Sequence, residues 1–270
     1  MASQKNRAAA FRRLHQGPEI LLLANCWDAG SARLIESLGA RAIATTSAGA
    51  AWALGYPDGD ALPLDLLAAA VANITRAIRV PLTVDMEGGY GKTPKAVGAA
   101  VGKVIDAGAI GMNIEDGSSS PDQLCRKIAE VKRTVNRKGV DFFVNARTDV
   151  YLRGLVPPAK RLAETLARAK RYRNAGADGI FVPGVAEPAA IRSITSAMDL
   201  PINLLAWPGL APAAKLAKLG VRRLSAGSAI SQAAAAVAAA KAKAFLTDGD
   251  STALREGAMT YDELNKLVSR

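Results

Sequence analysis

Short apolar runs and longer amphipathic stretches alternate along the chain. Four times a helical pattern ends in Leu-Gly or Ala-Gly, and an apolar run begins just after it, at Gly39, Gly108, Gly176 and Gly220. Glycine is the expected residue after a helix because it adopts the left-handed conformation without a Cβ clash. Each copy therefore predicts a helix that leads into a buried strand.

The spacing of these copies predicts further strands between them. Gly39, Gly108 and Gly176 are 69 and 68 residues apart, about twice the length of one βα unit. Apolar runs at 80–87, 140–147 and 200–207 fill the intervals, and a run at 19–25 opens the series. Helical patterns lie between the strands, at 64–78, 94–107, 121–135, 158–175 and 229–245.

Eight strands that alternate with helices over about 250 residues are typical of a closed (β/α)8 barrel. An open, doubly wound sheet is the alternative, but the segment after the first run lacks the Gly-x-Gly-x-x-Gly fingerprint of a dinucleotide site. We therefore predict an α/β fold: one (β/α)8 TIM barrel domain over 1–270, in which 246–270 is an extra C-terminal helical segment.

Composition indicates how the core of this barrel packs and in which compartment the protein is expected. Half of the residues are hydrophobic but only 5% are aromatic, which suits small side chains packed between helices and a parallel sheet. No apolar run reaches the roughly 18 residues of a membrane span, and the run at 20–24 is too short for a signal peptide. Two cysteines do not make a disulfide framework. We expect a cytoplasmic protein with no membrane partner.

The formal net charge of +11 raises the question of nucleic acid. The basic residues are scattered along helical patterns with few aromatic residues between them, which favours solvated helix faces. We therefore expect no nucleic-acid partner. A positive field also attracts a small anionic substrate.

Acidic residues collect after two neighbouring strands, where barrel enzymes carry their chemistry. Asp85 and Glu87 end the third predicted strand, and Glu115 and Asp116 end the fourth. Like charges so close raise one another's pKa unless a cation neutralises them. An oxygen-only set without histidine favours Mg²⁺, or Mn²⁺, over zinc. The alternative is that these acids pair with Arg147 and with strand-end amides.

Other strand ends offer groups that bind anions. Arg147, after the fifth strand, can grip a carboxylate in two places and stabilise developing negative charge; a salt bridge to Glu115 or Asp149 can hold at the same time. The Ser47-Ala48-Gly49 turn offers a hydroxyl and backbone N–H groups. Trp27 and Asn203 lie at the ends of the first and seventh strands.

Five motifs at these strand ends occur together: Ser47-Ala-Gly49, Gly55-Tyr-Pro-Asp58, Asp85-Met-Glu-Gly-Gly-Tyr-Gly91, Asn113-Ile-Glu-Asp116 and Asn145-Ala-Arg-Thr-Asp149. In order, spacing and strand position they resemble the isocitrate lyase / phosphoenolpyruvate mutase superfamily, over roughly 21–229. The resemblance implies a (β/α)8 barrel that exchanges its last helix between subunits, forms a homotetramer or homodimer, and binds Mg²⁺ with a small 2-oxo acid or its enolate.

The resemblance also implies roles for individual residues. Asp85 would ligate the metal, with Glu87 and Glu115 acting directly or through waters. Arg147 would hold the oxo-acid end and the enolate oxygen, and Asp58 would lie on a mobile segment that reaches the substrate when the site closes. The remaining candidates would bind substrate: Trp27, Ser47, Ala48, Gly49 and Asn203.

The chain departs from the family pattern after the fourth strand. Lyases of the family carry a Lys-Arg/Lys-Cys-Gly-His lid there and mutases carry Lys and Asn, whereas Asp116 is followed by Gly-Ser-Ser-Ser-Pro121. Cys125 falls on an apolar helical stripe and is expected to be packing rather than a substitute for the lid cysteine.

We therefore predict a Mg²⁺-dependent lyase or decarboxylase acting on a small 2-oxo or 2-hydroxy carboxylate through a metal-stabilised enolate. Two alternatives stay open: a phosphonopyruvate hydrolase or phosphonomutase, and a barrel that binds an oxo acid without turnover.

Overall fold

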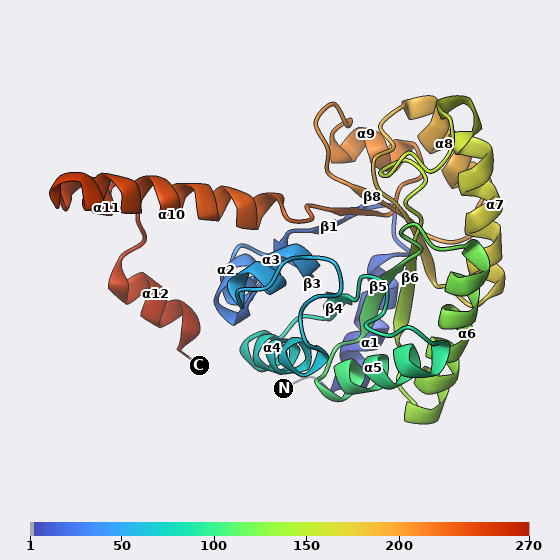
Figure 1. Cartoon of the computed structure of the whole chain (residues 1–270), viewed down its shortest axis with the longest axis horizontal. Coiled ribbons are helices and arrows are strands. Elements are labelled where there is room, and N and C mark those ends of the chain that lie inside the picture. The colour runs from blue at the N-terminus through green and yellow to red at the C-terminus, as the bar shows by residue number, and fades with distance from the viewer. Residues whose placement is uncertain (1–2, 270) are drawn as a thin grey trace.

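The computed structural model describes residues 3–269 and contains nine parallel strands in one sheet. The first predicted strand is split at Ala24: β1 pairs with β9, and β2 pairs with β3, so the sheet begins and ends on the same segment and forms a nearly closed barrel (Figure 1). The (β/α)8 prediction is confirmed. The strands are β1 (Leu21–Leu23), β2 (Asn25–Cys26), β3 (Ile43–Thr45), β4 (Leu82–Asp85), β5 (Gly111–Glu115), β6 (Phe143–Arg147), β7 (Gly179–Val182), β8 (Ile202–Leu205) and β9 (Arg223–Ser225).

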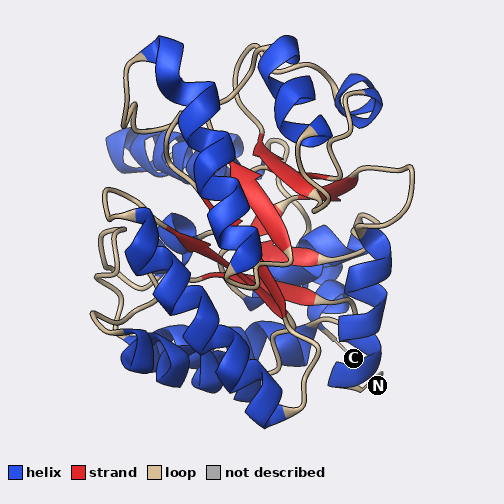
Figure 2. Ribbon diagram, turned by 90° about the vertical axis from the view of Figure 1, so that its right-hand side faces the viewer, coloured by secondary structure: helices blue, strands red, loops and turns tan. Residues whose placement is uncertain are grey.

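Helices surround the strands (Figure 2). Their ends follow local chemistry: Thr93 and Ser120 cap α5 and α6, each followed by proline at the first helical position, and Gly139 ends α6 with φ 64°. The predicted helices are present, except that 158–160 forms a 3₁₀ turn. The barrel helices are α2 (Ala29–Ser37), α3 (Ser47–Ala53), α4 (Leu64–Ala77), α5 (Pro94–Asp106), α6 (Pro121–Lys138), α7 (Arg161–Asn174), α8 (Pro188–Ser196) and α9 (Ala213–Lys218).

An additional helix, α1 (Gln4–Leu14), closes the floor of the barrel. Phe11 is fully buried and meets the Phe143 ring edge-on, with 5.5 Å between ring centroids. The His15 ring stacks on the Phe143 ring, with 4.3 Å between ring centroids. Burial lowers the pKa of the His15 imidazole to about 3, so it stays neutral at pH 7. The sequence pattern did not predict α1, because its apolar residues are few among many basic ones.

A polar layer lies above this floor, inside the barrel. The Asn145 amide donates to the side-chain oxygens of Asn113 and Asn203, at 2.9 and 3.0 Å, and Arg223 also donates to Asn113. These residues come from β5, β6, β8 and β9, so hydrogen bonds connect strands across the barrel interior. The carboxyl ends of the strands lie above this layer.

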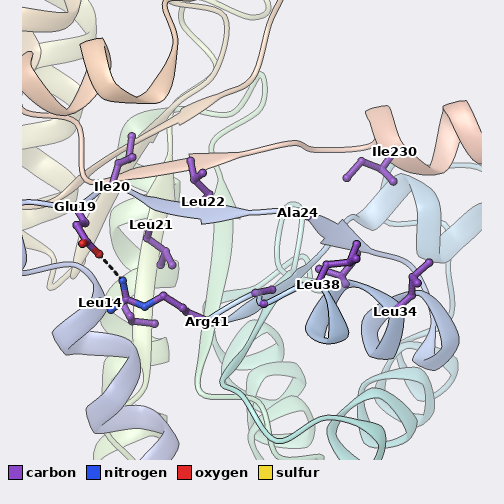
Figure 3. A pocket seen from close by; sticks show the side chains of 13 residues that line it. Leu14, Glu19, Ile20, Leu21, Leu22, Ala24, Leu34, Leu38, Arg41 and Ile230 are labelled. Carbon is purple, nitrogen blue, oxygen red and sulfur yellow. Dashed lines mark hydrogen bonds and ion pairs between the residues drawn. The ribbon is translucent and has the colours of Figure 1, made fainter. Parts of the chain in front are cut away.

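The chain ends in α10 (Ala229–Asp248), α11 (Thr252–Arg255) and α12 (Tyr261–Val268), which confirms a helical C-terminal segment. Figure 1 shows α10 extending away from the barrel, and Ser231 is its one buried residue. Beside its base lies an apolar pocket of about 550 Å³, lined by Leu22, Leu38 and Ile230 among others (Figure 3). None of the described helices has the length and apolar character that a membrane crossing requires.

We expect Phe11→Ala to lower the free energy of unfolding by about 3–5 kcal/mol, because it leaves a cavity between α1 and the barrel floor. Urea denaturation followed by circular dichroism measures this loss. Leu66→Ala, on the exposed face of α4, is the control and should change stability far less. Equal losses in the two variants would contradict the role of α1 as the floor.

Candidate active site

Three predicted residues meet at the carboxyl ends of adjacent strands. Side chains alternate between the inside and outside of a barrel strand, and the last residues of β4, β5 and β6 are Asp85, Glu115 and Arg147. Glu115 and Arg147 are direct register partners, and their side chains form an ion pair at 2.7 Å. The predicted carboxylates and guanidinium therefore lie at one mouth.

Arg147 is held by more than one carboxylate. Its Nε donates to Asp149 Oδ1 at 2.7 Å, and Arg153 Nε donates to the other Asp149 oxygen at 2.8 Å. Burial lowers the pKa of Arg147, but Glu115, Asp149 and Asp85 together raise it above its ordinary value. Both ion pairs that the sequence left open, to Glu115 and to Asp149, are present.

Asp85 has an oxygen without a partner. Its backbone N–H donates to Thr45 Oγ1 at 2.9 Å, but side-chain Oδ1 is buried and accepts no hydrogen bond. Burial raises the pKa of this carboxyl, and the opposing effects of Arg147 and the Ser47 hydroxyl are smaller. A buried carboxylate oxygen with no donor is costly unless a cation or a proton occupies it.

The pKa of the Glu115 carboxyl is also raised by its surroundings. Burial raises its pKa to about 8, and the neighbouring charges of Asp85 and Asp149 add to the rise, while Arg147 and Arg153 oppose it. Three carboxyl groups, Asp85, Glu115 and Asp149, thus share two guanidinium groups, and burial favours the protonated form of Glu115 at neutral pH.

Glu87, which the sequence assigned to the metal directly or through water, has protein donors on both carboxylate oxygens. Its Oε2 accepts from the backbone of Gly59 at 2.8 Å and from that of Asp60, and its Oε1 accepts from the Tyr90 hydroxyl at 2.7 Å. Both oxygens are thus engaged by protein donors, because the longer Glu arm reaches the loop that precedes α4 rather than the space beside Asp85.

Asp116 is structural. Its buried carboxylate accepts from the Asp149 backbone, from Arg168 Nη1 at 2.9 Å and from the Tyr172 hydroxyl at 2.6 Å. It fixes the segment that carries Asp149, and so holds Arg147 indirectly.

Asn203 does not face the mouth. It is 1% exposed and lies in the interior polar layer, where Asn145, Ser225 and backbone carbonyls satisfy its amide. It lies on the predicted strand, and its hydrogen bond with Asn145 places it in the interior layer. Its contact with substrate remains a prediction.

The Ser47-Ala48-Gly49 segment forms the first turn of α3, with Thr46 as the N-cap. The first amides of a helix have no intrahelical acceptor and point to its N-terminal end. A Cβ at Gly49 would lie 2.7 Å from Thr46, 3.0 Å from the Trp27 Cβ and 3.0 Å from Ser231 of α10. Only glycine fits this packing, which brings Trp27 and α10 beside the turn.

Asp58 lies in the exposed loop between α3 and α4. Its charge contributes to the raised pKa values of Asp85 and Glu87, so it lies within electrostatic reach of the mouth. On the opposite side the family lid is reduced to a turn at 117–120, where Ser119 donates to the Asp116 carbonyl and Ser120 caps α6. Cys125 packs, half-buried, on α6 away from the mouth.

Within residues 3–269, no group of three or more His, Cys, Asp or Glu side chains is arranged as a ready metal cage. The donor chemistry still fits a hard cation held by few protein ligands. Mg²⁺ commonly takes one or two carboxylates and keeps several waters, and the unpaired Asp85 oxygen beside Glu115 matches that pattern. Sequence reasoning missed Arg153 as a partner of the site; its position four residues after Asp149 was the available signal.

Comparison with known proteins agrees with this arrangement. Residues 11–246 match the family model for phosphoenolpyruvate phosphomutase. An uncharacterized protein of Mycobacterium tuberculosis is 36% identical over 89% of this chain and 90% of its own length. An oxaloacetate decarboxylase of Paraburkholderia xenovorans is 34% identical over 80% of this chain and 75% of its own. The 2-methylisocitrate lyase of Escherichia coli is 30% identical over 72% of this chain and 67% of its own length.

Solved structures extend the likeness to three dimensions. A candidate phosphonomutase from Burkholderia cenocepacia J2315 has a TM-score of 0.84 and 40% identity, covering 89% of this chain and 99% of its own. A 2,3-dimethylmalate lyase of the PEP mutase/isocitrate lyase superfamily has a TM-score of 0.86 at 24% identity, covering 99% and 95%, and supports the fold alone. The chain therefore belongs to the phosphoenolpyruvate phosphomutase family.

Proposed function

We propose that this protein is a Mg²⁺-dependent lyase or decarboxylase that breaks a bond next to the carbonyl of a small 2-oxo or 2-hydroxy carboxylate. The observation that carries the proposal is the buried, unpartnered oxygen of Asp85 beside the Arg147 guanidinium. Relatives named oxaloacetate decarboxylase and 2-methylisocitrate lyase support the same class of reaction.

Asp85 would hold the cation directly, and Glu115 would do so directly or through water. Glu87 takes no direct bond in this proposal, since its oxygens are occupied. Mn²⁺ is the alternative ion, because the donors are oxygen atoms only. When bound, the ion supplies Lewis-acid stabilisation of negative charge on the substrate carbonyl oxygen.

The remaining residues would bind and orient the substrate. The Ser47 hydroxyl and the amides of Ser47 and Ala48 would receive a carboxylate at the start of α3, beside Gly49, whose own N–H donates to Thr46 Oγ1. Trp27 would wall the pocket. Arg147 would hold the oxo-acid end and stabilise the oxyanion that forms when the adjacent bond breaks. Asp58, on the open side, would carry the proton exchanged at carbon, since the family lid cysteine is absent.

A second reaction has a specific observation in its favour. The candidate phosphonomutase is 40% identical to this chain, and the same guanidinium and cation would hold phosphonopyruvate. Assays of 2-oxo acids and phosphonopyruvate with Mg²⁺ separate the two, because a decarboxylase or lyase releases CO₂ or a small oxo acid and a phosphonopyruvate hydrolase releases phosphate. No product from any of these substrates would favour an oxo-acid-binding barrel without turnover.

We further propose a cytoplasmic protein with one barrel domain over 1–270, the segment 246–270 being its extension, assembled as a homodimer or homotetramer by exchange of α10. The helix is about 30 Å long, is exposed along nearly all its length, and leaves uncovered an apolar pocket where Leu22 and Leu38 are 54% and 79% exposed. A partner's α10 would cover that surface.

Oxalate, a mimic of the enolate, should stabilise the protein only when Mg²⁺ is present. At about a hundredfold excess over Kd we expect the Tm to rise by roughly 5 °C, and Asp85→Ala should abolish the rise because it removes the unpaired oxygen. Differential scanning fluorimetry measures both. Equal stabilisation in EDTA would refute the metal assignment.

Mg²⁺ binding should release a proton from Glu115. Its pKa of about 8 lies above the ordinary value of 4.5, so it is largely protonated at pH 7, and a nearby cation favours the ionised form. Calorimetry at pH 7 in buffers of different ionisation enthalpy should give between about half and one proton per ion, and Glu115→Gln should give almost none. Binding to the unsubstituted protein without proton release contradicts the assignment. Without the ion, stability conferred by protonated Glu115 should decline as pH rises from 4.5 toward 8.

Leu38→Asp should reduce the mass of the assembly in solution, because it places a charge in the pocket that the partner's α10 would cover. Size-exclusion chromatography with light scattering gives the mass, and Leu66→Asp, on α4, is the control. A monomeric unsubstituted protein would rule out the proposed exchange.

A further inference from the structure

Every non-glycine residue with a left-handed backbone in the described chain lies in one small cluster beside the mouth. Asp60, Glu87 and Tyr90 have φ values of 57°, 46° and 53°. Such conformations cost free energy for residues with a Cβ, most of all for long or aromatic side chains, and they persist where surrounding contacts enforce them. Their coincidence in one cluster indicates a shared constraint.

The constraint comes from two acidic residues, Glu87 and Asp60, each of which contacts the backbone of the other's segment. The Glu87 carboxylate reaches out to the loop before α4 and accepts the backbone N–H groups of Gly59 and Asp60. The Asp60 carboxylate reaches back over Gly88, and its pKa, raised by burial, is lowered again by hydrogen bonds from the Tyr90 and Gly88 backbone. Each acid therefore holds the other's backbone.

Two further side chains complete this cluster. The Tyr90 hydroxyl donates to the second oxygen of Glu87 at 2.7 Å. Lys127, a buried residue of α6, donates to the Gly88 carbonyl at 2.6 Å, and its charge acts on Asp60. We call Glu87, Asp60, Tyr90 and Lys127 the clasp. It ties the loop before α4 to the end of β4 and to α6.

Few other contacts hold the loop near its tip. Tyr56 and Leu62 pack against the core at its two ends, while residues 57–61 between them are exposed. Asp58 lies in this exposed part, directly before Gly59 and Asp60, whose backbone N–H groups donate to Glu87. The clasp therefore sets the position of Asp58 relative to Asp85.

We propose that Glu87 is a positioning residue that fixes the loop carrying Asp58 over the barrel mouth, through the clasp and not through the metal. This rests on the proposed function only for the role of Asp58. Compared with Asp, the additional methylene of Glu87 gives about 1.5 Å of reach. That reach is what allows the carboxylate to engage Gly59 and Asp60.

Hydrogen exchange of the loop tests the proposal without any substrate. In the full-length protein, Glu87→Asp keeps the charge and tolerates the left-handed backbone better than Glu, but its carboxylate falls short of the loop. We expect exchange in a peptide spanning 57–61 to become at least about tenfold faster, while peptides of β5 and β6 are unchanged. Glu87→Gln keeps the length and should stay close to the unsubstituted protein.

Glu130→Asp, at a surface carboxylate of α6 that pairs with Arg133, is the matched control and should leave the loop unaffected. Unchanged loop exchange in Glu87→Asp would overturn the proposal. So would equal acceleration in Glu87→Gln and Glu87→Asp, since reach would then not be the cause. The oxalate experiment with Asp85→Ala tests the metal and the reaction separately, so the two failures can be told apart.

Discussion

The mouth of the barrel depends on the way one buried guanidinium, Arg147, is shared between two acids. Glu115 and Asp149 both pair with it, and Arg153 adds a second positive charge. Because Arg147, Glu115 and Asp149 are largely shielded from water, the balance of their charges is felt more strongly than at a surface. Asp85 Oδ1 is left without a hydrogen-bond donor, and this is the atom proposed to bind a cation.

The architecture that holds these groups is rigid. Asp116 anchors the backbone of Asp149 and is itself held by Arg168 and Tyr172 of α7, so the guanidinium is supported by a second set of buried bonds. Below it, the amides of Asn113, Asn145 and Asn203 join three strands. Preorganised charges of this kind need little rearrangement when negative charge develops on a substrate.

Sequence periodicity predicted the strands and most helices because a closed parallel barrel repeats one pattern, with glycine after several of its helices. It failed for α1, whose few apolar residues are meaningful only against the barrel floor. It located Asp85, Glu115 and Arg147 correctly, since a strand's last residue is fixed by its apolar run. The hydrogen-bond partners of Glu87 and Asn203 could not be read from the sequence, because they come from neighbours far along the chain. The splitting of the first strand at Ala24 likewise depends on its two separate partners, β9 and β3.

Gly49 connects two parts of the molecule that are otherwise remote. Its missing side chain leaves just enough room for Thr46, Trp27 and the hydroxyl of Ser231, the one buried residue of α10. A helix anchored there cannot tilt without pressing on the turn proposed to receive a carboxylate. If α10 is exchanged between subunits as proposed, this contact would link subunit association to ligand affinity, and each would change the other by the same factor.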